Sequence, residues 1–346
     1  MKNFDFWSFL KRARKGCKKK IENNRLSLYS GNMGHKRFIN PHIIDSKRKF
    51  RHVLRWRAGF YREPISHPPE DFVYPYTPPL FQPKLPSVVW IGHCTFVLQV
   101  DSLVVLTDPI WSQYCAPVKI RGLKRLHDAP IGLEDLPIVD IVLLSHNHYD
   151  HLDEATVLRL HRLHPHILWV VPDRLSSWFK KREIDHVAEL SWWKTHETPL
   201  YKVTAVPAQH YSGRTLWDQN KTHWNGYVFE SKRSGKRFYF TGDTGYNPVG
   251  FKEIGRNWPY MDLSLIPIGT YIPITFMSPV HCSPYDGVEI HQDVSSKLSI
   301  GMHWKTFRLS DEPLNRPPYD LFLALQKKGL DPSSFLPLEP GQFINW

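Results

Sequence analysis

Short hydrophobic runs, many of them rich in β-branched residues, recur from residue 88 onward and are separated by polar or turn-forming residues. Such runs are typical of strands. They predict strands at 88–91, 96–100, 103–107, 141–144, 168–171, 203–206, 227–230, 238–241, 263–266 and 300–302. No apolar run approaches the roughly 18 residues that a helix needs to cross a bilayer. We therefore expect a β-rich domain without a transmembrane helix.

Helical patterns lie between some of the predicted strands. Asp153 is placed to cap a helix that runs to about Leu163, and Ser283 with Asp286 predicts a capping box at the start of another. Apolar residues at intervals of four continue the second pattern: Ile290, Val294 and Leu298. Strands in mixed order with a few helices predict two packed sheets with helices outside them.

Charge is concentrated at the N-terminus. The formal net charge is +12, and residues 1–62 hold 18 of the 45 Lys and Arg residues but only 3 of the 33 Asp and Glu residues. A stretch with eight prolines, residues 63–86, follows and cannot hold a regular helix. We therefore divide the chain into a basic aromatic extension (1–62), a Pro-rich strap (63–86) and a main domain (87–346).

Residues 1–22 combine Phe and Trp with many Lys and Arg residues. This composition favours peripheral contact with an anionic membrane surface, and a solvated basic tail is the alternative. Nucleic acid is a weaker candidate because no nucleic-acid motif accompanies the charge. The apolar part is too short for a signal peptide, so we expect a location in the cytoplasm or on the cytoplasmic face of a membrane.

The stretch Ser145–Asp153 carries the clearest chemistry. His146 and His148 are two residues apart, so an extended backbone projects both to one side, and Asp150 and His151 follow at the turn into a helix. Nitrogen and oxygen ligands suit zinc, with manganese, iron and nickel left open. The alternative is a polar turn in a chain with 19 histidines. The four cysteines lie far apart without a C-x-x-C pair, which excludes a cysteine zinc finger.

This H-x-H-x-D-H pattern after an apolar strand resembles the metallo-β-lactamase superfamily of binuclear metal hydrolases. The residues of this motif are similar to those of the branch that contains N-acyl phosphatidylethanolamine-hydrolysing phospholipase D and bacterial relatives. Further matching segments follow in order at 90–96, 107–109, 208–214, 241–246, 266–271 and 302–307. The resemblance implies a four-layer αββα sandwich behind the basic N-terminal extension, with residues 87–346 as the hydrolase domain.

The resemblance also implies a ligand set for two divalent metal ions, zinc first and Mn²⁺ or Fe²⁺ as alternatives. One ion takes His146, His148 and His210, the other takes Asp150, His151 and His303, and Asp243 bridges both. Asp243 lies between two glycines just after a predicted strand, and His303 ends another, so both positions fit ligands at strand ends.

Two such ions deprotonate a water, and the hydroxide that bridges them attacks the substrate. Asp150 would orient this hydroxide. The resemblance places His281 at a position that contacts a phosphate or protonates a leaving group, and Tyr149 at a second substrate-facing position; a packing role is the alternative for both. His93 and Asp108 would support ligand histidines.

The histidines His223, His281 and His291 are not needed as metal ligands, and we expect His291 on an exposed helix face. The predicted function is hydrolysis of a phosphodiester, such as an N-acyl phosphatidylethanolamine-type phospholipid. The alternatives are a cytosolic lactonase or esterase of a small phosphorylated metabolite, a nuclease and a non-catalytic metal-binding scaffold. A homo-oligomer is left open.

Overall fold

The computed structural model describes residues 37–42, 50–77, 79–82, 86–215 and 217–346. The chain divides into two compact units, 1–36 and 37–346, and all structure below concerns the second unit. The membrane contact predicted for residues 1–22 thus lies outside the described residues. Within the described part of the chain, every helix is too short or too polar to span a bilayer.

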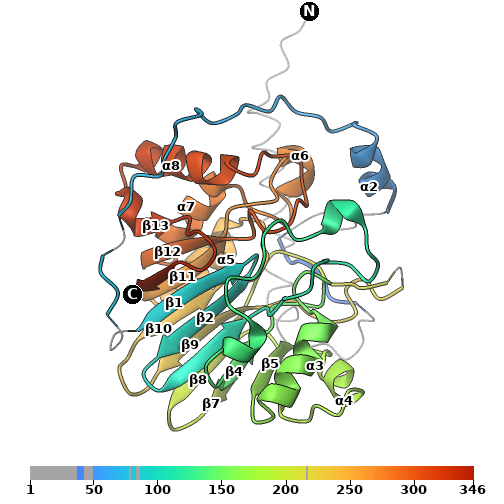
Figure 1. Ribbon diagram of the computed structural model, residues 1–346, viewed down its shortest axis with the longest axis vertical. Helices are drawn as coiled ribbons and strands as arrows, with labels where there is room; N and C mark the ends of the chain where they lie inside the picture. The colour runs from blue at the N-terminus through green and yellow to red at the C-terminus, as the bar shows by residue number, and fades with distance from the viewer. Residues whose placement is uncertain (1–36, 43–49, 78, 83–85, 216) are drawn as a thin grey trace, which may run out of the picture. The chain divides into compact units, whose positions relative to one another are not determined.

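Two seven-stranded sheets form the centre of this unit (Figure 1). The first contains β1 (Ser87–Gly92), β2 (Thr95–Val100), β3 (Leu103–Thr107), β4 (Ile141–Leu143), β5 (Leu168–Pro172), β6 (Val187–Leu190) and β14 (Phe343–Asn345), in the order β14-β1-β2-β3-β4-β5-β6. The second contains β7 (Thr195–Glu197), β8 (Tyr201–Val206), β9 (Gly226–Ser231), β10 (Arg237–Phe240), β11 (Met261–Pro267), β12 (Ser296–Met302) and β13 (Phe335–Leu336), in the order β13-β12-β11-β10-β9-β8-β7. Both sheets are mixed, because β3 to β6 and β10 to β13 pair in parallel while the other neighbours are antiparallel.

Alternation along the strands creates the layers. In β1, Val88 and Trp90 are buried in the core between the sheets, whereas Val89 and Ile91 belong to the cluster on the opposite face. Successive side chains of a strand point to opposite faces, so one strand contributes to two apolar layers. This is why the predicted strands are almost continuously hydrophobic.

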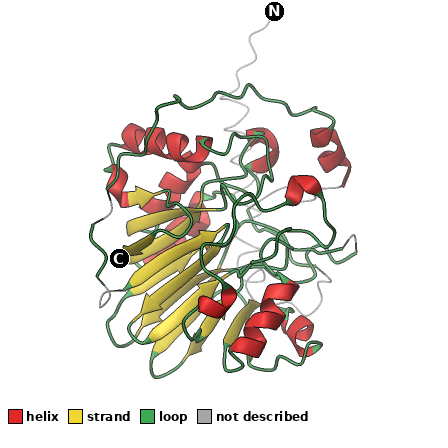
Figure 2. Ribbon diagram, in the orientation of Figure 1, coloured by secondary structure: helices red, strands yellow, loops and turns green. Residues whose placement is uncertain are grey.

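Helices cover both outer faces (Figure 2). Side chains of α3 (Glu154–Leu163) and α4 (Ser176–Lys180) pack on the first sheet, and α5 (Pro248–Asn257), α7 (Pro284–Asp293) and α8 (Arg316–Lys328) cover the second. The other helices in the described part of the chain are α2 (Phe50–Arg57), α6 (Ile274–Met277) and the 3₁₀ turns η1 (Arg121–Leu123), η2 (Leu133–Asp135) and η3 (Pro332–Ser334). The αββα sandwich predicted from the resemblance is confirmed.

All ten predicted strands are present, but two local predictions were wrong and a third held only in part. Asp153 is the N-cap residue of α3, which ends at Leu163 as predicted, but its side chain makes no capping hydrogen bond; it accepts hydrogen bonds from the hydroxyls of Ser112 (2.8 Å) and Thr156 (2.5 Å) instead. The second helix has the predicted capping box but ends at Asp293, and Leu298 lies in β12. His291 is buried, with Nδ1 2.8 Å from Ser299 Oγ, because α7 packs this face against β12.

Candidate metal centre

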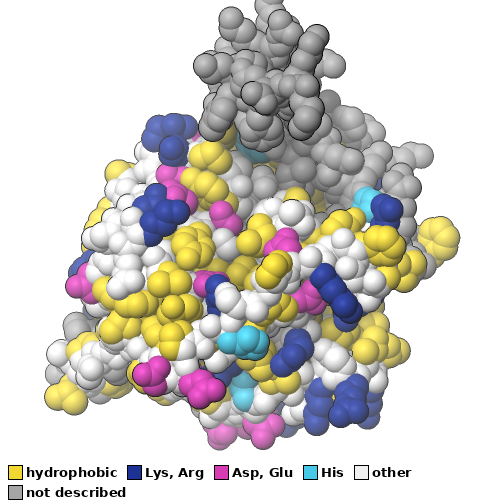
Figure 3. Space-filling model, turned by 90° about the horizontal axis from the view of Figure 1, so that it is seen from above, with side chains coloured by type: hydrophobic (Ala, Val, Ile, Leu, Met, Phe, Trp, Pro, Cys, Tyr) yellow, Lys and Arg dark blue, Asp and Glu magenta, His cyan; other side chains and the backbone are white. Residues whose placement is uncertain are grey.

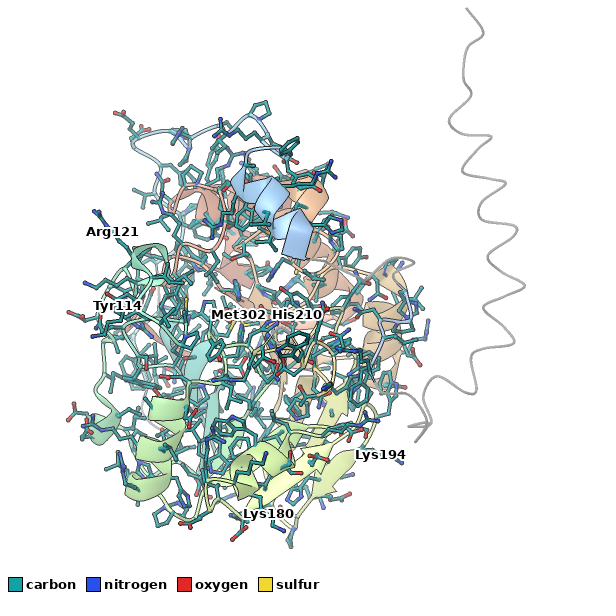
Figure 4. The ribbon with its side chains drawn as sticks, turned by 90° about the vertical axis from the view of Figure 1, so that its right-hand side faces the viewer. Tyr114, Arg121, Lys180, Lys194, His210 and Met302 are labelled. Carbon is teal, nitrogen blue, oxygen red and sulfur yellow. The ribbon has the colours of Figure 1, made fainter. Side chains whose placement is uncertain are left out.

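Polar side chains from both sheets meet at one edge of the sandwich. The loop after β4 carries His146 to His151, and the segments after β8, β10 and β12 carry His210, Asp243 and His303. Strands β8, β10 and β12 run in the same direction, so their carboxyl ends share an edge. Figure 4 labels His210 near the centre of the unit, whereas Lys180 and Lys194 lie at its periphery.

Three histidine nitrogens form a first cluster. His148 Nδ1 lies 2.7 Å from His146 Nε2 and 3.3 Å from His210 Nε2. All three rings are buried or nearly so. Imidazole nitrogens that converge in this way can bind one metal ion.

A carboxylate oxygen joins this cluster to a second one. Asp243 Oδ2 lies 3.0 Å from His303 Nε2, 3.2 Å from His151 Nε2 and 3.7 Å from His210 Nε2. Asp150 Oδ2 lies 3.3 Å from His151 Nε2. The Asp243 side chain therefore lies close to nitrogens of both clusters.

Four of these histidine rings, all but that of His148, are oriented through their second nitrogen. His151 Nδ1 lies 2.6 Å from Asp108 Oδ2, and His303 Nδ1 lies 3.1 Å from Thr270 Oγ1. Nδ1 of His146 and of His210 similarly meet Ser145 Oγ (2.9 Å) and the Val280 carbonyl (2.8 Å). Such partners determine the tautomer and orientation of a ligand histidine. His93 orients a carboxylate instead, because its Nε2 lies 2.9 Å from Asp150 Oδ2.

The backbone at the site adopts unusual conformations. Gly242 has φ +59°, and a Cβ there would lie 2.6 Å from the Cβ of Ser145. His303 also has a positive φ, 63°, which is uncommon for a residue with a side chain. Such strain concentrates at functional sites and is maintained by the surrounding structure.

The pKa values at the site are shifted by two causes, burial and neighbouring charges. Burial lowers the pKa of His210 to about 3 and the pKa of His148 to about 4. Burial would also lower the pKa of His303, but the carboxylates of Asp243 and Asp150 outweigh it and raise that pKa to about 9. The pKa of Asp243, which burial alone would raise, is held well below its usual range by His303 and His151. The carboxylates are thus ionised and suited to a cation.

Two buried histidine nitrogens without a hydrogen bond indicate that the site can bind a metal ion. Among the described residues, His151 Nε2 and His303 Nε2 are buried and make no hydrogen bond, although both point at carboxylate oxygens. A buried polar atom without a hydrogen bond is costly unless something else binds it. A bound cation would use both nitrogens and the facing carboxylates.

Comparisons with known proteins agree with this geometry. Residues 104–304 match the model of a β-lactamase superfamily domain. The chain is 36% identical over 264 residues to N-acyl-phosphatidylethanolamine-hydrolyzing phospholipase D 1 of Caenorhabditis elegans, covering 73% of this chain and 74% of that protein. The chain belongs to the metallo-β-lactamase superfamily. It is a metal-dependent hydrolase of that superfamily.

Two further similarities have lower sequence identity than this one. The chain is 33% identical to the mitochondrial N-acyl-phosphatidylethanolamine-hydrolyzing phospholipase D of Saccharomyces cerevisiae, over 72% of this chain and 53% of that protein. Among solved structures, the metallo hydrolase Igni18 of Ignicoccus hospitalis has a TM-score of 0.56 at 20% identity, covering 75% of this chain and 98% of that one. The latter likeness concerns the fold alone.

A pocket of about 670 Å³ opens onto the polar edge. His148, Asp150, Asp243 and His303 line its floor, together with Tyr149 and His281. His281 Nδ1 lies 3.8 Å from Asp243 Oδ2. The Tyr149 ring lies under the guanidinium of Arg214, whose Cζ is 3.9 Å from the ring centroid. The structure thus brings all nine residues predicted for the site to one place: Tyr149, His281 and the seven ligand candidates.

Sequence reasoning missed the apolar wall of the pocket. Val53 and Trp56 of α2 lie there opposite Phe276 and Met277 of α6, and the rings of Trp56 and Phe276 stack at 5.6 Å. Sequence reasoning also missed Asn40, whose Nδ2 donates to the carbonyl of His210 at 2.6 Å. All three N-terminal residues lie in the basic extension, where the charge gave no sign of a role in the pocket.

Proposed function

We propose that this protein is a binuclear metal-dependent phosphodiesterase that hydrolyses a phospholipid of the N-acyl phosphatidylethanolamine type. The observation that carries the proposal is the position of Asp243 Oδ2 between two groups of donors, at the floor of a pocket with an apolar wall. The relatives named as phospholipases support the choice of substrate.

The ligand assignment follows the two clusters. One ion would be held by His146, His148 and His210, the other by Asp150, His151 and His303, with Asp243 shared. Zinc suits these nitrogen and oxygen donors, and Mn²⁺ and Fe²⁺ are alternatives. Bound divalent ions supply Lewis acidity that makes a water nucleophilic near neutral pH and offsets the charge of a phosphodiester.

The protein's own groups then position the substrate and move protons. Asp150 is oriented by His93 and would accept a hydrogen bond from the attacking water. His281 lines the pocket beside Asp243 and is placed to donate a proton to the leaving oxygen, a contribution of about 10²- to 10⁴-fold. Tyr149 is kept in place by Arg214 and would contact the substrate headgroup.

The pocket wall favours a lipid over a small polar metabolite. Val53, Trp56, Phe276, Met277 and Leu309 present apolar surface around the polar floor. Apolar surface removed from water contributes about 25 cal/mol per Å². An acyl chain uses this surface, whereas a small phosphorylated lactone does not.

A substrate panel tests the proposal. Metal content is measured first by elemental analysis, and the same preparation is then given bis(p-nitrophenyl) phosphate, N-acyl phosphatidylethanolamine in mixed micelles, and a lactone. We expect about two metal ions per chain and faster hydrolysis of both phosphodiesters than of the lactone. In water labelled with heavy oxygen, the label should enter the phosphatidate. A faster lactone reaction, or metal content near zero after Zn²⁺ addition, would contradict the proposal.

His281→Ala supplies a second test. Loss of a proton donor should slow hydrolysis of the phosphodiester by about tenfold or more and spare a strained lactone, which carries no phosphate charge. Metal content of the variant must match the unmodified protein. Equal losses on both substrates would show that His281 supports the site generally.

We also propose that residues 1–22 contact an anionic membrane. The support is their mixture of aromatic and basic side chains. A chain without residues 1–22 should sediment less with anionic vesicles and hydrolyse a soluble diester normally. Unchanged sedimentation would reduce the segment to a solvated tail.

A further inference from the structure

A second cavity lies beside the substrate pocket. Its volume is about 470 Å³, and it shares Trp56 and Leu309 with the substrate pocket as a common wall. Three arginines line it: Arg57, Arg62 and Arg308. The first two lie in and after α2, and the third lies more than two hundred residues later. The fold has therefore gathered positive charge from two distant segments around one concave surface.

The acidic residues of this cavity are already engaged. Glu63 accepts hydrogen bonds from the backbone N–H groups of Ile274 (3.0 Å) and Thr275 (3.3 Å) at the start of α6. Asp311 Oδ2 accepts a hydrogen bond from the Trp56 indole at 2.9 Å. Both carboxylates thus connect α2 and the segment after it to the rest of the domain and form no ion pair with the arginines. The lining keeps three cations against two anions.

The N–H groups of the three guanidinium groups are available to bind a ligand. All three side chains are exposed, and none forms an ion pair or donates a side-chain hydrogen bond to another described residue. Arg57 stacks on Trp56, with Cζ 4.6 Å from the ring centroid. Stacking occupies the face of a guanidinium but leaves the N–H donors at its edge, which match the oxygens of a phosphate.

We propose that this cavity is a binding site for a phosphate-type anion, distinct from the metal centre. Three cations that line one cavity, with free donors and with space for a phosphate and part of its substituent, are what such an anion requires. The anion is the headgroup phosphate of a membrane lipid or a soluble phosphomonoester. Because the wall is shared, an anion here lies beside the substrate pocket, whatever that pocket hydrolyses.

The surroundings fit the lipid source. Exposed apolar side chains stand near the arginines: Leu54, Phe60 and Ile65 around α2, and Ile274 at α6. Figure 3 views the end of the unit that carries α2, α6 and α8, and shows dark blue basic side chains among yellow hydrophobic ones. Apolar and basic groups together are typical of a surface that meets lipid headgroups.

Phosphate titration by calorimetry tests the site on the full-length, metal-loaded protein. The variant changes Arg57→Gln, Arg62→Gln and Arg308→Gln together. The matched control removes three exposed arginines elsewhere: Arg162→Gln, Arg233→Gln and Arg256→Gln. We expect phosphate to bind the control at the metal centre and at the cavity, and the cavity phase to weaken by about tenfold or more in the variant alone. Thermal melting and metal content should be equal in all three proteins.

Two further arms identify the source of the anion. The control and the variant are compared for sedimentation with phosphatidylglycerol–phosphatidylcholine vesicles and for binding of glycerol 3-phosphate. Weaker vesicle binding of the variant supports the site with a lipid headgroup, and weaker glycerol phosphate binding alone supports it with a soluble ligand. Equal binding of inorganic phosphate, glycerol phosphate and vesicles by both proteins would overturn the proposal. Failure of the metal centre to hydrolyse a phosphodiester would leave these differences intact.

Discussion

The two sides of the substrate pocket are built in different ways. At the metal-binding edge, ligand side chains follow strand ends, and each buried ring has a second partner such as Asp108 or Thr270. At the wall formed by α2, the contacts are mostly apolar, and Val53 and Leu54 are 37% and 53% exposed. The first region is positioned by dense hydrogen bonding inside the sandwich, whereas the second rests on few contacts at its surface.

We infer from this difference that the metal-binding edge carries out the reaction, whereas the α2 wall selects the substrate. Strand ends within a packed sandwich hold donors within a few tenths of an ångström, as metal binding requires. A surface helix attached through Glu63 and Trp56 can differ in sequence without disturbing that framework. We therefore expect changes at the edge to abolish hydrolysis and changes at the wall to alter selectivity.

The largest effect is expected for Asp243→Asn. The amide keeps the size of the side chain but removes the charge that faces His303 and His151. We expect loss of bound metal and a fall in phosphodiester turnover of about 10³-fold or more. Metal analysis and turnover of Asp185→Asn, an exposed carboxylate away from the site, provide the control. Near-normal turnover would show that Asp243 is not the bridge.

A smaller effect on the same side is expected for Asp108→Ala. Asp108 orients His151 and accepts a hydrogen bond from the backbone N–H of Ser145 at 2.6 Å. Removal of such a support weakens metal affinity by about 10- to 100-fold. Competition with a chromophoric chelator measures this affinity, and excess metal should restore part of the turnover. If affinity is unchanged while the protein melts earlier, Asp108 serves the fold and not the ligand.

At the apolar wall, we expect Trp56→Ala to affect the lipid substrate more than a soluble one. Loss of an indole from the wall should raise KM for the lipid by about 30-fold, because about 2 kcal/mol of apolar contact is lost. A small soluble diester should be affected much less. Tyr260→Ala, an exposed aromatic residue just before β11, is the control. Equal losses on both substrates would mean that the two sides are not independent.

Asn40→Ala is expected to have the smallest effect. Its amide donates to the carbonyl of His210, so the N-terminal segment reaches the metal edge through one buried hydrogen bond. Loss of this bond leaves a carbonyl unpaired, at a cost of about 1–3 kcal/mol. We expect metal affinity to fall a few-fold and Asn257→Ala to leave it unchanged. If both variants behave alike, residues 37–42 only cover the surface.

The sequence by itself predicted the longer strands and the cluster from His146 to His151, because both depend on local order. The αββα sandwich and the later ligand candidates His210, Asp243 and His303 were implied by the family resemblance. Hydrophobic runs predicted the longer strands, and His146, His148, Asp150 and His151 are so close in sequence that any strand-to-helix turn brings them together. It did not reveal β6, β7, β13 and β14, which are short or at the ends of the sheets. Strands of this kind depend on their neighbours more than on their own residues.

Only the tertiary structure decided the surroundings of the edge. The exposure predicted for His291 was wrong because a helical position does not say which element packs on it. The α2 wall, the Asn40 contact and the arginine cavity all join segments more than a hundred residues apart. Such contacts arise when the chain folds back on itself, and neither periodicity nor motif spacing in one sequence encodes them.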